Sequence, residues 1–241
     1  MTIRRPAWLD VAALVFVFVA LALALTSPPI EGQGDSGRML FIHVPTIWLA
    51  YLAFAVTFVA SIAYLATKAL KWDLVAASSA EIGVVFTTVA IIGGAIWGKA
   101  TWNVYWTWDA RLTLTAVMLF VYIGYLALRR AIPDPEARAR RSSVLGVLGL
   151  VQLIPVHFSV VWWRTLHQTN TFSPRGIEMD MSIRIVLFTA VAAFTVVYAA
   201  LLKHRVELAQ LDLESHEAAA AAEGPVAGDA VSAPSVGSSG A

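Results

Sequence analysis

The segment 97–111 concentrates large flat rings beside one acid and two bases. It holds four of the chain's nine tryptophans, and the residues of interest are Trp97, Gly98, Lys99, Trp102, Trp106, Trp108, Asp109 and Arg111. Flat rings offer stacking surface, and arginines bind carboxylates through two parallel hydrogen bonds. This combination suits a flat, amphipathic, partly anionic ligand, and haem is the first candidate.

Histidines at two distant places in the sequence are candidate iron ligands. His43 lies in Phe-Ile-His-Val-Pro-Thr, and His167 lies in Trp-Trp-Arg-Thr-Leu-His-Gln, which also contains Arg164. The chain has no cysteine, so thiolate metal sites and covalent c-type haem on this chain are excluded. Two neutral imidazoles can ligate one iron from opposite sides, which makes His43 and His167 candidate axial ligands.

Each of these features also has a simpler interpretation. Membrane interfaces are rich in tryptophan, so an aromatic belt explains the tryptophan positions without a ligand. A histidine at a helix end is commonly a hydrogen-bonded residue, and Asp109 with Arg111 is as consistent with a structural ion pair as with a ligand role. The ligand interpretation rests on the coincidence of both histidines, the tryptophans and several cations on one face, the cations being Lys99, Arg111, Arg164 and Arg175.

The composition determines which elements must position these residues. The chain of 241 residues is 59% hydrophobic and 14% charged, with a mean hydropathy of +0.71, which predicts an all-α integral membrane protein. There is no polybasic block of the kind that binds nucleic acid. The apolar runs predict six transmembrane helices at about 8–26, 44–67, 82–97, 112–128, 144–163 and 183–202.

Orientation follows from the positive charges in alternating loops. Eleven Lys and Arg residues fall on the side of the termini and six on the other side, which predicts cytoplasmic termini and an outward-facing tryptophan loop between helices three and four. His43 and His167 then lie at the same outer surface as that loop. If the loop is helical, Trp102, Trp106 and Asp109 share one side of it.

Other polar residues have less specific expectations. His157 lies within the fifth helix beside Pro155, and an ionisable residue inside a span is a functional candidate or a packing residue at a kink. We expect Glu81 to be a solvated acid at the start of helix three, and His204 and His216 to be solvated on the cytoplasmic side. The predicted domains are a membrane domain over 1–205 and a disordered cytoplasmic tail over 206–241, which has few large apolar residues.

At these motifs the chain resembles a known family. The matching segments are Trp97-Gly98-Lys99, Trp102, Trp106, Trp108-Asp109-Ala110-Arg111-Leu112-Thr113, His43-Val44-Pro45 and Trp162-Trp163-Arg164-Thr165-Leu166-His167-Gln168. The first four resemble the WWD signature of haem-handling proteins, and the whole pattern over about residues 5–205 resembles the haem exporter protein C family, CcmC. The chain departs from that pattern at Ala100, Asn103, Tyr105 and Leu114, where proline, glycine, tryptophan and serine are common.

The resemblance implies a protein of the bacterial inner membrane that holds haem b transiently and without a covalent bond at the outer face. It implies His43 and His167 as axial ligands and the WWD loop as a platform. It also implies delivery of haem to the chaperone CcmE, together with the ATP-binding cassette subunits CcmA and CcmB and the small protein CcmD. The sequence contains no G-x-x-x-x-G-K-[ST] phosphate loop, so we expect a transfer component without ATPase activity of its own.

The alternative is a cytochrome c synthetase of the CcsA type, an enzyme that shares the WWD loop. Those proteins resemble a longer chain with further helices and an extra histidine pair inside the membrane. Here only His157 lies within a predicted span. A subunit holding haem b between helices would need facing histidine pairs deep in the bundle, which this chain does not have.

Overall fold

The computed structural model describes residues 8–167, 172–173, 176–177 and 179–223. Within these ranges the chain is helical apart from one two-stranded hairpin. The elements in chain order are α1 (Trp8–Thr26), η1 (Asp35–Met39), α2 (Leu40–Thr67), α3 (Leu70–Trp102), α4 (Ala110–Ala131), α5 (Pro135–Val151), α6 (Leu153–Trp162), β1 (Phe172–Ser173), β2 (Gly176–Ile177) and α7 (Met181–Glu223). The strands β1 and β2 pair antiparallel.

The described ranges contain six helical segments that are long and apolar enough to cross a membrane, which confirms the predicted number of spans. Two of them combine neighbouring elements, because η1 runs into α2 and α5 runs into α6. Many large apolar side chains on these helices are exposed, as expected where lipid rather than protein covers them.

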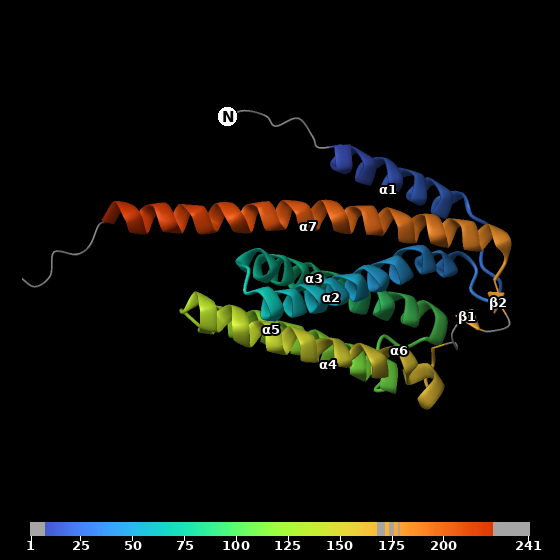
Figure 1. Cartoon of the computed structure of the whole chain (residues 1–241). Helices are drawn as coiled ribbons and strands as arrows, with labels where there is room; N and C mark the ends of the chain where they lie inside the picture. The colour runs from blue at the N-terminus through green and yellow to red at the C-terminus, as the bar shows by residue number, and fades with distance from the viewer. Residues whose placement is uncertain (1–7, 168–171, 174–175, 178, 224–241) are drawn as a thin grey trace, which may run out of the picture.

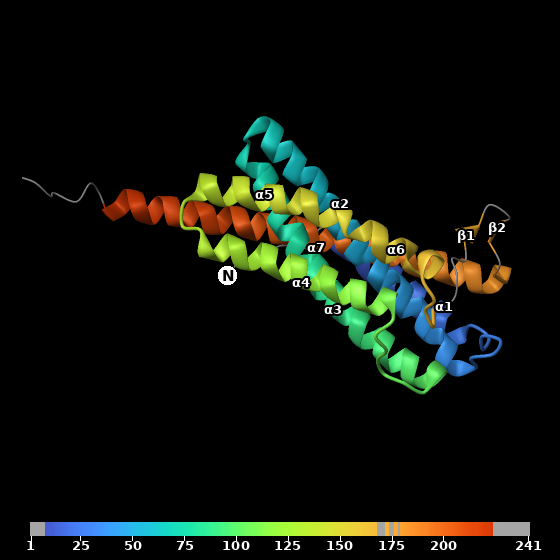
Figure 2. The same ribbon diagram turned by 90° about the horizontal axis from the view of Figure 1, so that it is seen from below.

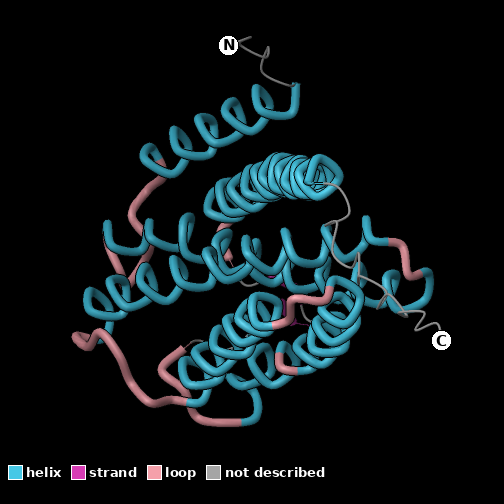
Figure 3. Tube along the Cα trace, turned by 90° about the vertical axis from the view of Figure 1, so that its left-hand side faces the viewer, coloured by secondary structure: helices cyan, strands magenta, loops and turns pink. Residues whose placement is uncertain are grey.

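The helices are stacked in layers, with α1 outermost on the side of α7 (Figure 1). α1 packs on α7, α7 packs on the closely paired α2 and α3, and α4 with α5 and α6 forms a further layer. The view along the bundle shows the same stacking (Figure 3). The core between the α2–α3 pair and the group of α4, α5 and α6 contains Phe54, Met118, Tyr122 and Val156, all fully buried.

The connections fall at two opposite ends of the bundle. The α1–α2 and α3–α4 loops, the end of α6 and the strands β1 and β2 gather at one end, which we call the site end (Figure 2). The α2–α3 and α4–α5 turns lie at the far end. The predicted alternation of loops therefore brings His43, the tryptophan loop and His167 to the same end of the bundle.

Helix α3 is longer than the apolar run 82–97 predicted. It begins at Leu70 and includes Asp73 and Glu81, whose charges are paired with residues from other helices. Asp73 accepts two hydrogen bonds from Arg129 of α4, at 2.5 and 2.8 Å, and Glu81 forms an ion pair with Arg205 of α7. Glu81 is thus a paired residue inside α3, and the expectation of a solvated acid at a helix start is wrong.

Helix α7 also extends beyond its predicted end. It continues to Glu223, so the expected absence of structure from residue 206 is wrong for 206–223. The Ala-rich composition of this segment accounts for the helix, because alanine has the highest helix propensity of the amino acids. Residues 224–241 lie outside the described ranges. On the same helix, His204 Nε2 lies 2.6 Å from Asp10 Oδ1 of α1, so His204 is not simply solvated.

Candidate haem site

A cavity of about 420 Å³ lies at the site end of the bundle. Its volume falls within the range of pockets that hold small molecules and cofactors. The lining comes from five helices, α2, α3, α4, α6 and α7, and from the chain segments that precede α2, join α3 to α4, follow α6 and precede α7. Its polar and aromatic members include Gln33, His43, Tyr51, Trp97, Thr101, Trp102, Tyr105, Trp106, Thr107, Arg111, Thr115, His157, His167 and Arg184.

Both predicted iron ligands line this cavity, and each lies beside a tryptophan of α3. The rings of His43 and Trp97 are 5.7 Å apart at an interplanar angle of 62°, and those of His167 and Trp102 are 5.0 Å apart at 71°. These are edge-to-face arrangements, which aromatic pairs prefer to direct stacking. Trp97 is itself oriented by the hydrogen bond that its Nε1 donates to Gln33 Oε1 at 3.1 Å.

The position of His43 depends on a glycine in the neighbouring helix. A Cβ atom at Gly94 of α3 would lie 2.7 Å from Cε1 of His43 and 3.3 Å from its Nδ1. Only a residue without a side chain leaves room for the imidazole there. His43 Nδ1 is buried without a hydrogen-bond partner in the described part of the protein. Packing against Gly94 and Trp97 therefore contributes to the position of this imidazole.

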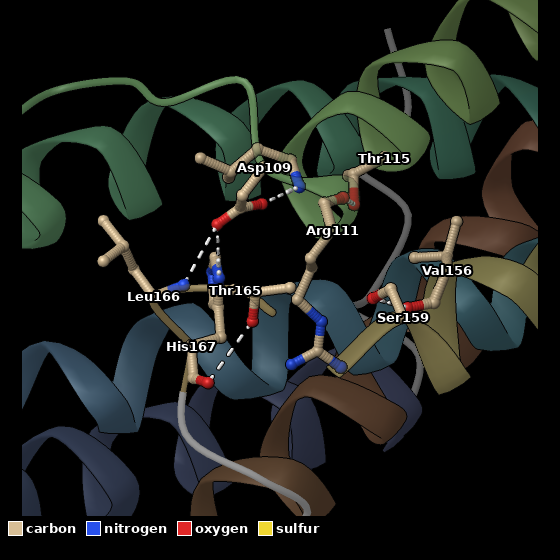
Figure 4. Close-up of polar contacts among 9 residues, drawn as sticks. Asp109, Arg111, Thr115, Val156, Ser159, Thr165, Leu166 and His167 are labelled. Atoms are coloured by element: carbon tan, nitrogen blue, oxygen red, sulfur yellow. Dashed lines mark hydrogen bonds and ion pairs between the residues drawn. The ribbon is translucent and has the colours of Figure 1, made fainter. Parts of the chain in front are cut away.

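His167 is positioned by the start of α4. Asp109 is the N-cap residue of α4, and its Oδ1 accepts a hydrogen bond from Leu112 N at 2.9 Å. Its Oδ2 lies 3.5 Å from His167 Nδ1 and accepts a long hydrogen bond from Leu166 N at 3.4 Å (Figure 4). The carboxylate thus links the loop after α6 to the first turn of α4.

The electrostatics keep His167 neutral. Burial lowers its pKa below the usual value, while nearby Asp109 opposes the shift and Arg111 adds to it. A neutral imidazole is the form that binds a metal. At physiological pH the side chain can therefore donate an electron pair without first losing a proton.

Arg111 brings positive charge to the cavity lining. Figure 4 shows its side chain extending from α4 with no dashed line to the guanidinium. Among the described residues Arg111 makes no ion pair, so the suggested pairing with Asp109 is wrong. The described lining contains a second cation, Arg184, and no acid. Such a lining suits a ligand that carries carboxylates.

The tryptophan loop is extended rather than helical. Asn103, with φ at 59°, ends α3 in the left-handed conformation, and Lys99 Nζ donates to its backbone and side-chain oxygens at 3.1 and 2.8 Å. The expectation that helical spacing places Trp102, Trp106 and Asp109 on one side of the loop is therefore wrong. Gly98 lies in α3 against this loop, since a Cβ atom there would lie 3.2 Å from the Val104 carbonyl oxygen.

The predicted site residues separate into two groups. The structure brings His43, Trp97, Gly98, Trp102, Trp106, Arg111 and His167 to the cavity lining. Asp109 contacts His167 from outside the lining, Trp108 is 81% exposed, and Arg164 is exposed at the end of α6. Arg175 lies outside the described residues. Sequence reasoning missed Gln33, Tyr51, Gly94 and Arg184, which carry no motif and are recognised only by their place in the fold.

This arrangement defines a six-span membrane protein with a cavity at one end of its bundle that presents imidazoles, tryptophans and positive charge. The donor set fits an iron porphyrin, because it offers two nitrogen ligands, flat apolar walls and cations for carboxylates. The chain belongs to the family described as Heme exporter protein C, which matches residues 1–221. It is thus a membrane component of haem export in cytochrome c maturation.

Individual relatives agree with the family match. The chain is 36% identical to the Heme exporter protein C of Bradyrhizobium diazoefficiens over 202 residues, covering 83% of this chain and 77% of that protein. It is 38% identical to the Heme exporter protein C of Escherichia coli over 181 residues, covering 72% and 71%. A putative cytochrome c biosynthesis ccmC-like mitochondrial protein of Marchantia polymorpha is 34% identical over 162 residues, covering 67% and 68%.

Proposed function

We propose that the protein holds haem b between His43 and His167 at the outer face of the bacterial inner membrane and passes it to the haem chaperone CcmE. The observation that carries this proposal is the meeting of both imidazoles in one cavity, although they are 124 residues apart in the sequence. Lysine and arginine counts support the outward orientation of that cavity.

Each group of residues has a separate task in this proposal. His43 and His167 supply electron pairs to the iron, and Trp97 and Trp102 keep the two imidazoles in place. Arg111 binds a propionate carboxylate by charge-assisted hydrogen bonds. The contact with Asp109 fixes the orientation of His167, as carboxylates commonly do for histidines that bind metals.

The handover to CcmE uses the exposed part of the same loop. Trp108 is 81% exposed and is not part of the cavity lining, whereas Trp106, two residues earlier in the chain, lines the cavity. Exposed Tyr and Trp side chains are favoured at protein interfaces. The loop thus offers one surface to haem and another to a partner. The chain itself supplies no phosphate loop, so CcmA with CcmB provides the energy for release of the loaded chaperone.

The test is the absorption spectrum of the purified protein loaded with haem. The wild type should show a low-spin spectrum, and His43→Ala and His167→Ala should each remove or strongly alter it. His216→Ala is the control, because His216 is exposed near the end of α7, far from the cavity. Equal haem content and an unchanged spectrum in both ligand variants contradict the proposal.

A further inference from the structure

A third imidazole lines the cavity from a different helix. His157 of α6 lies within the membrane-spanning segment Pro135–Trp162 and contributes to the same lining as His43 and His167. Its ring has an edge-to-face contact with Phe158, with ring centroids 5.1 Å apart. An ionisable side chain inside a span needs an explanation, and the holding site described above already has its two ligands.

His157 is exposed as well as lining the cavity. On α6 it lies between two sides of the helix. One side carries the buried Val156 and Val160, and the other faces lipid and carries Ile154 and Val161, which are 52% and 62% exposed. The side chain therefore stands where the cavity meets the apolar outer surface of the bundle. Because this part of α6 is inside a span, that surface faces the bilayer and not the aqueous phase.

Helix α7 contributes a second residue with the same combination of properties. Phe188 lines the cavity and is 44% exposed, within the span Met181–Ala219. His157 and Phe188 are thus rim residues on two helices that are distant in the sequence. In the described part of the chain, the cavity therefore reaches the lipid-facing surface at α6 and α7.

The segment that carries His157 is interrupted between α5 and α6. α5 packs against α2 and α4, and a Cβ atom at Gly146 would lie 2.5 Å from Ser61 Oγ of α2. At Gln152 the helix is interrupted ahead of Pro155, and the α6 part that follows packs against α4. His157 directly follows Val156, which is fully buried in the core, so it lies where the packed face of α6 ends and the cavity begins.

We propose that this side opening admits haem from the lipid bilayer and that His157 is the first residue to bind its iron, before His43 and His167 hold it. This inference rests on the proposed haem-holding function. An iron porphyrin is a flat, largely apolar molecule that partitions into membranes, so a lipid-facing opening with a single nitrogen ligand matches its chemistry. Arg111, which binds a carboxylate in the proposed holding site, lines the cavity that the porphyrin then occupies.

The first experiment measures uptake from lipid. Wild type and His157→Gln are reconstituted in phosphatidylcholine vesicles that already contain haem, and the appearance of the low-spin spectrum is followed in time. We expect the initial rate to fall about tenfold in the variant, the size of effect that follows loss of a residue supporting a metal site, and by more than any fall in final haem content. A rate equal to that of the wild type overturns the inference.

A matched control separates the imidazole from the surface on which it lies. Ile154→Ala changes a lipid-exposed residue on the same helix that is not in the cavity lining, and its uptake rate should match that of the wild type. An equal slowing in this variant shows a general effect of the α6 surface and overturns the role of His157. If His157→Gln lowers final content as much as the rate, His157 belongs to the holding site, which also overturns its role as first ligand.

A second experiment detects binding by His157 directly. In the double variant His43→Ala, His167→Ala, residual haem should show the spectrum of iron bound by one imidazole, and adding His157→Gln should remove it. An identical spectrum in the double and triple variants contradicts the inference. The proposed function fails by a different result, namely a wild-type protein that never develops a low-spin spectrum dependent on His43 and His167.

Discussion

The carboxylate of Asp109 lies 3.5 Å from Nδ1 of His167, although the two residues belong to different connections at the site end of the bundle. One oxygen of this side chain caps α4, and the other faces the imidazole. The same residue therefore fixes the start of a helix and the orientation of a candidate iron ligand. Asp109 is not itself part of the cavity lining, so within the described residues it acts on the cavity through His167.

Replacement of Asp109 by Asn should separate these two tasks. The Asn side chain still accepts the hydrogen bond from Leu112 N, so α4 keeps its cap. The negative charge beside His167 is lost, which lowers the basicity of the imidazole and weakens its hold on ferric iron. We expect haem affinity to fall about tenfold and the midpoint potential of bound haem to become more positive. Haem titration and redox potentiometry measure the two effects.

Asp134→Asn is the matched control, because Asp134 caps α5 in the same way and lies at the α4–α5 turn of the far end. It should leave both haem affinity and midpoint potential unchanged. A potential that does not move in Asp109→Asn, in protein of normal thermal stability, shows that the Asp109–His167 contact has no effect on the iron.

Two adjacent glycines of α3 provide a test of the position of His43. Alanine at Gly94 would place a Cβ atom 2.7 Å from the imidazole, whereas alanine at Gly93 would have no atom within 4 Å. Both changes raise helix propensity by up to about 1 kcal/mol, so neither should unfold α3. Only Gly94→Ala forces His43 to move. We expect a lower haem affinity and an altered spectrum in Gly94→Ala and wild-type behaviour in Gly93→Ala. Equal affinities in the two variants mean that the imidazole is free to shift.

Much of the fold could be predicted from the sequence because the bilayer imposes a simple rule. Six apolar runs gave the number of spans, and the alternation of loops brought His43, the tryptophans and His167 to one end. Helix limits were less predictable. The third apolar run was predicted to begin at Ile82, but α3 begins at Leu70 and includes Asp73 and Glu81, which are paired with Arg129 and Arg205 of other helices. A single segment of sequence carries no sign of such distant partners.

The residue types of the candidate site could be predicted from the sequence, but the tryptophan that contacts each histidine could not. The association of Trp97 with His43 and of Trp102 with His167 depends on α3 continuing to Trp102 and then ending in the left-handed turn at Asn103. Helical spacing instead grouped Trp102 with Trp106 and Asp109, because periodicity cannot tell where a helix stops. The exposure of Trp108 follows from the same extended loop.

Trp106 should contribute to haem binding, and Trp108 should contribute to the handover of haem to CcmE. Trp106 lines the cavity and Trp108 faces solvent, with the two rings 5.6 Å apart at 81°. Trp106→Leu should weaken haem binding about three- to tenfold, as expected for the loss of one aromatic contact. Trp108→Leu should retain haem binding and lower the yield of covalent haem on co-expressed CcmE. Haem titration and the haem stain of the chaperone provide the two measurements. If Trp108→Leu loads the chaperone normally, the exposed side of the loop takes no part in the handover.

The ion pair between Asp73 and Arg129 should dominate the stability of the far end. Its side chains are only 2% and 13% exposed and form two hydrogen bonds between α3 and α4. Arg129→Met leaves Asp73 as an unpaired buried charge, which should cost about 3–5 kcal/mol. The double variant Asp73→Leu, Arg129→Met removes both charges and should regain most of this loss. Arg130→Met, at an exposed neighbour, should change stability by less than about 0.5 kcal/mol.

The measurement for these variants is the midpoint of thermal unfolding in one detergent, together with the low-spin haem spectrum at low temperature. Arg129→Met should unfold earlier than the wild type and still give the normal spectrum while folded, because the ion pair and the cavity lie at opposite ends of the bundle. Equal midpoints for Arg129→Met and Arg130→Met contradict a stabilising role for the pair. A changed spectrum in folded Arg129→Met instead shows that packing at the far end is coupled to the positions of His43 and His167.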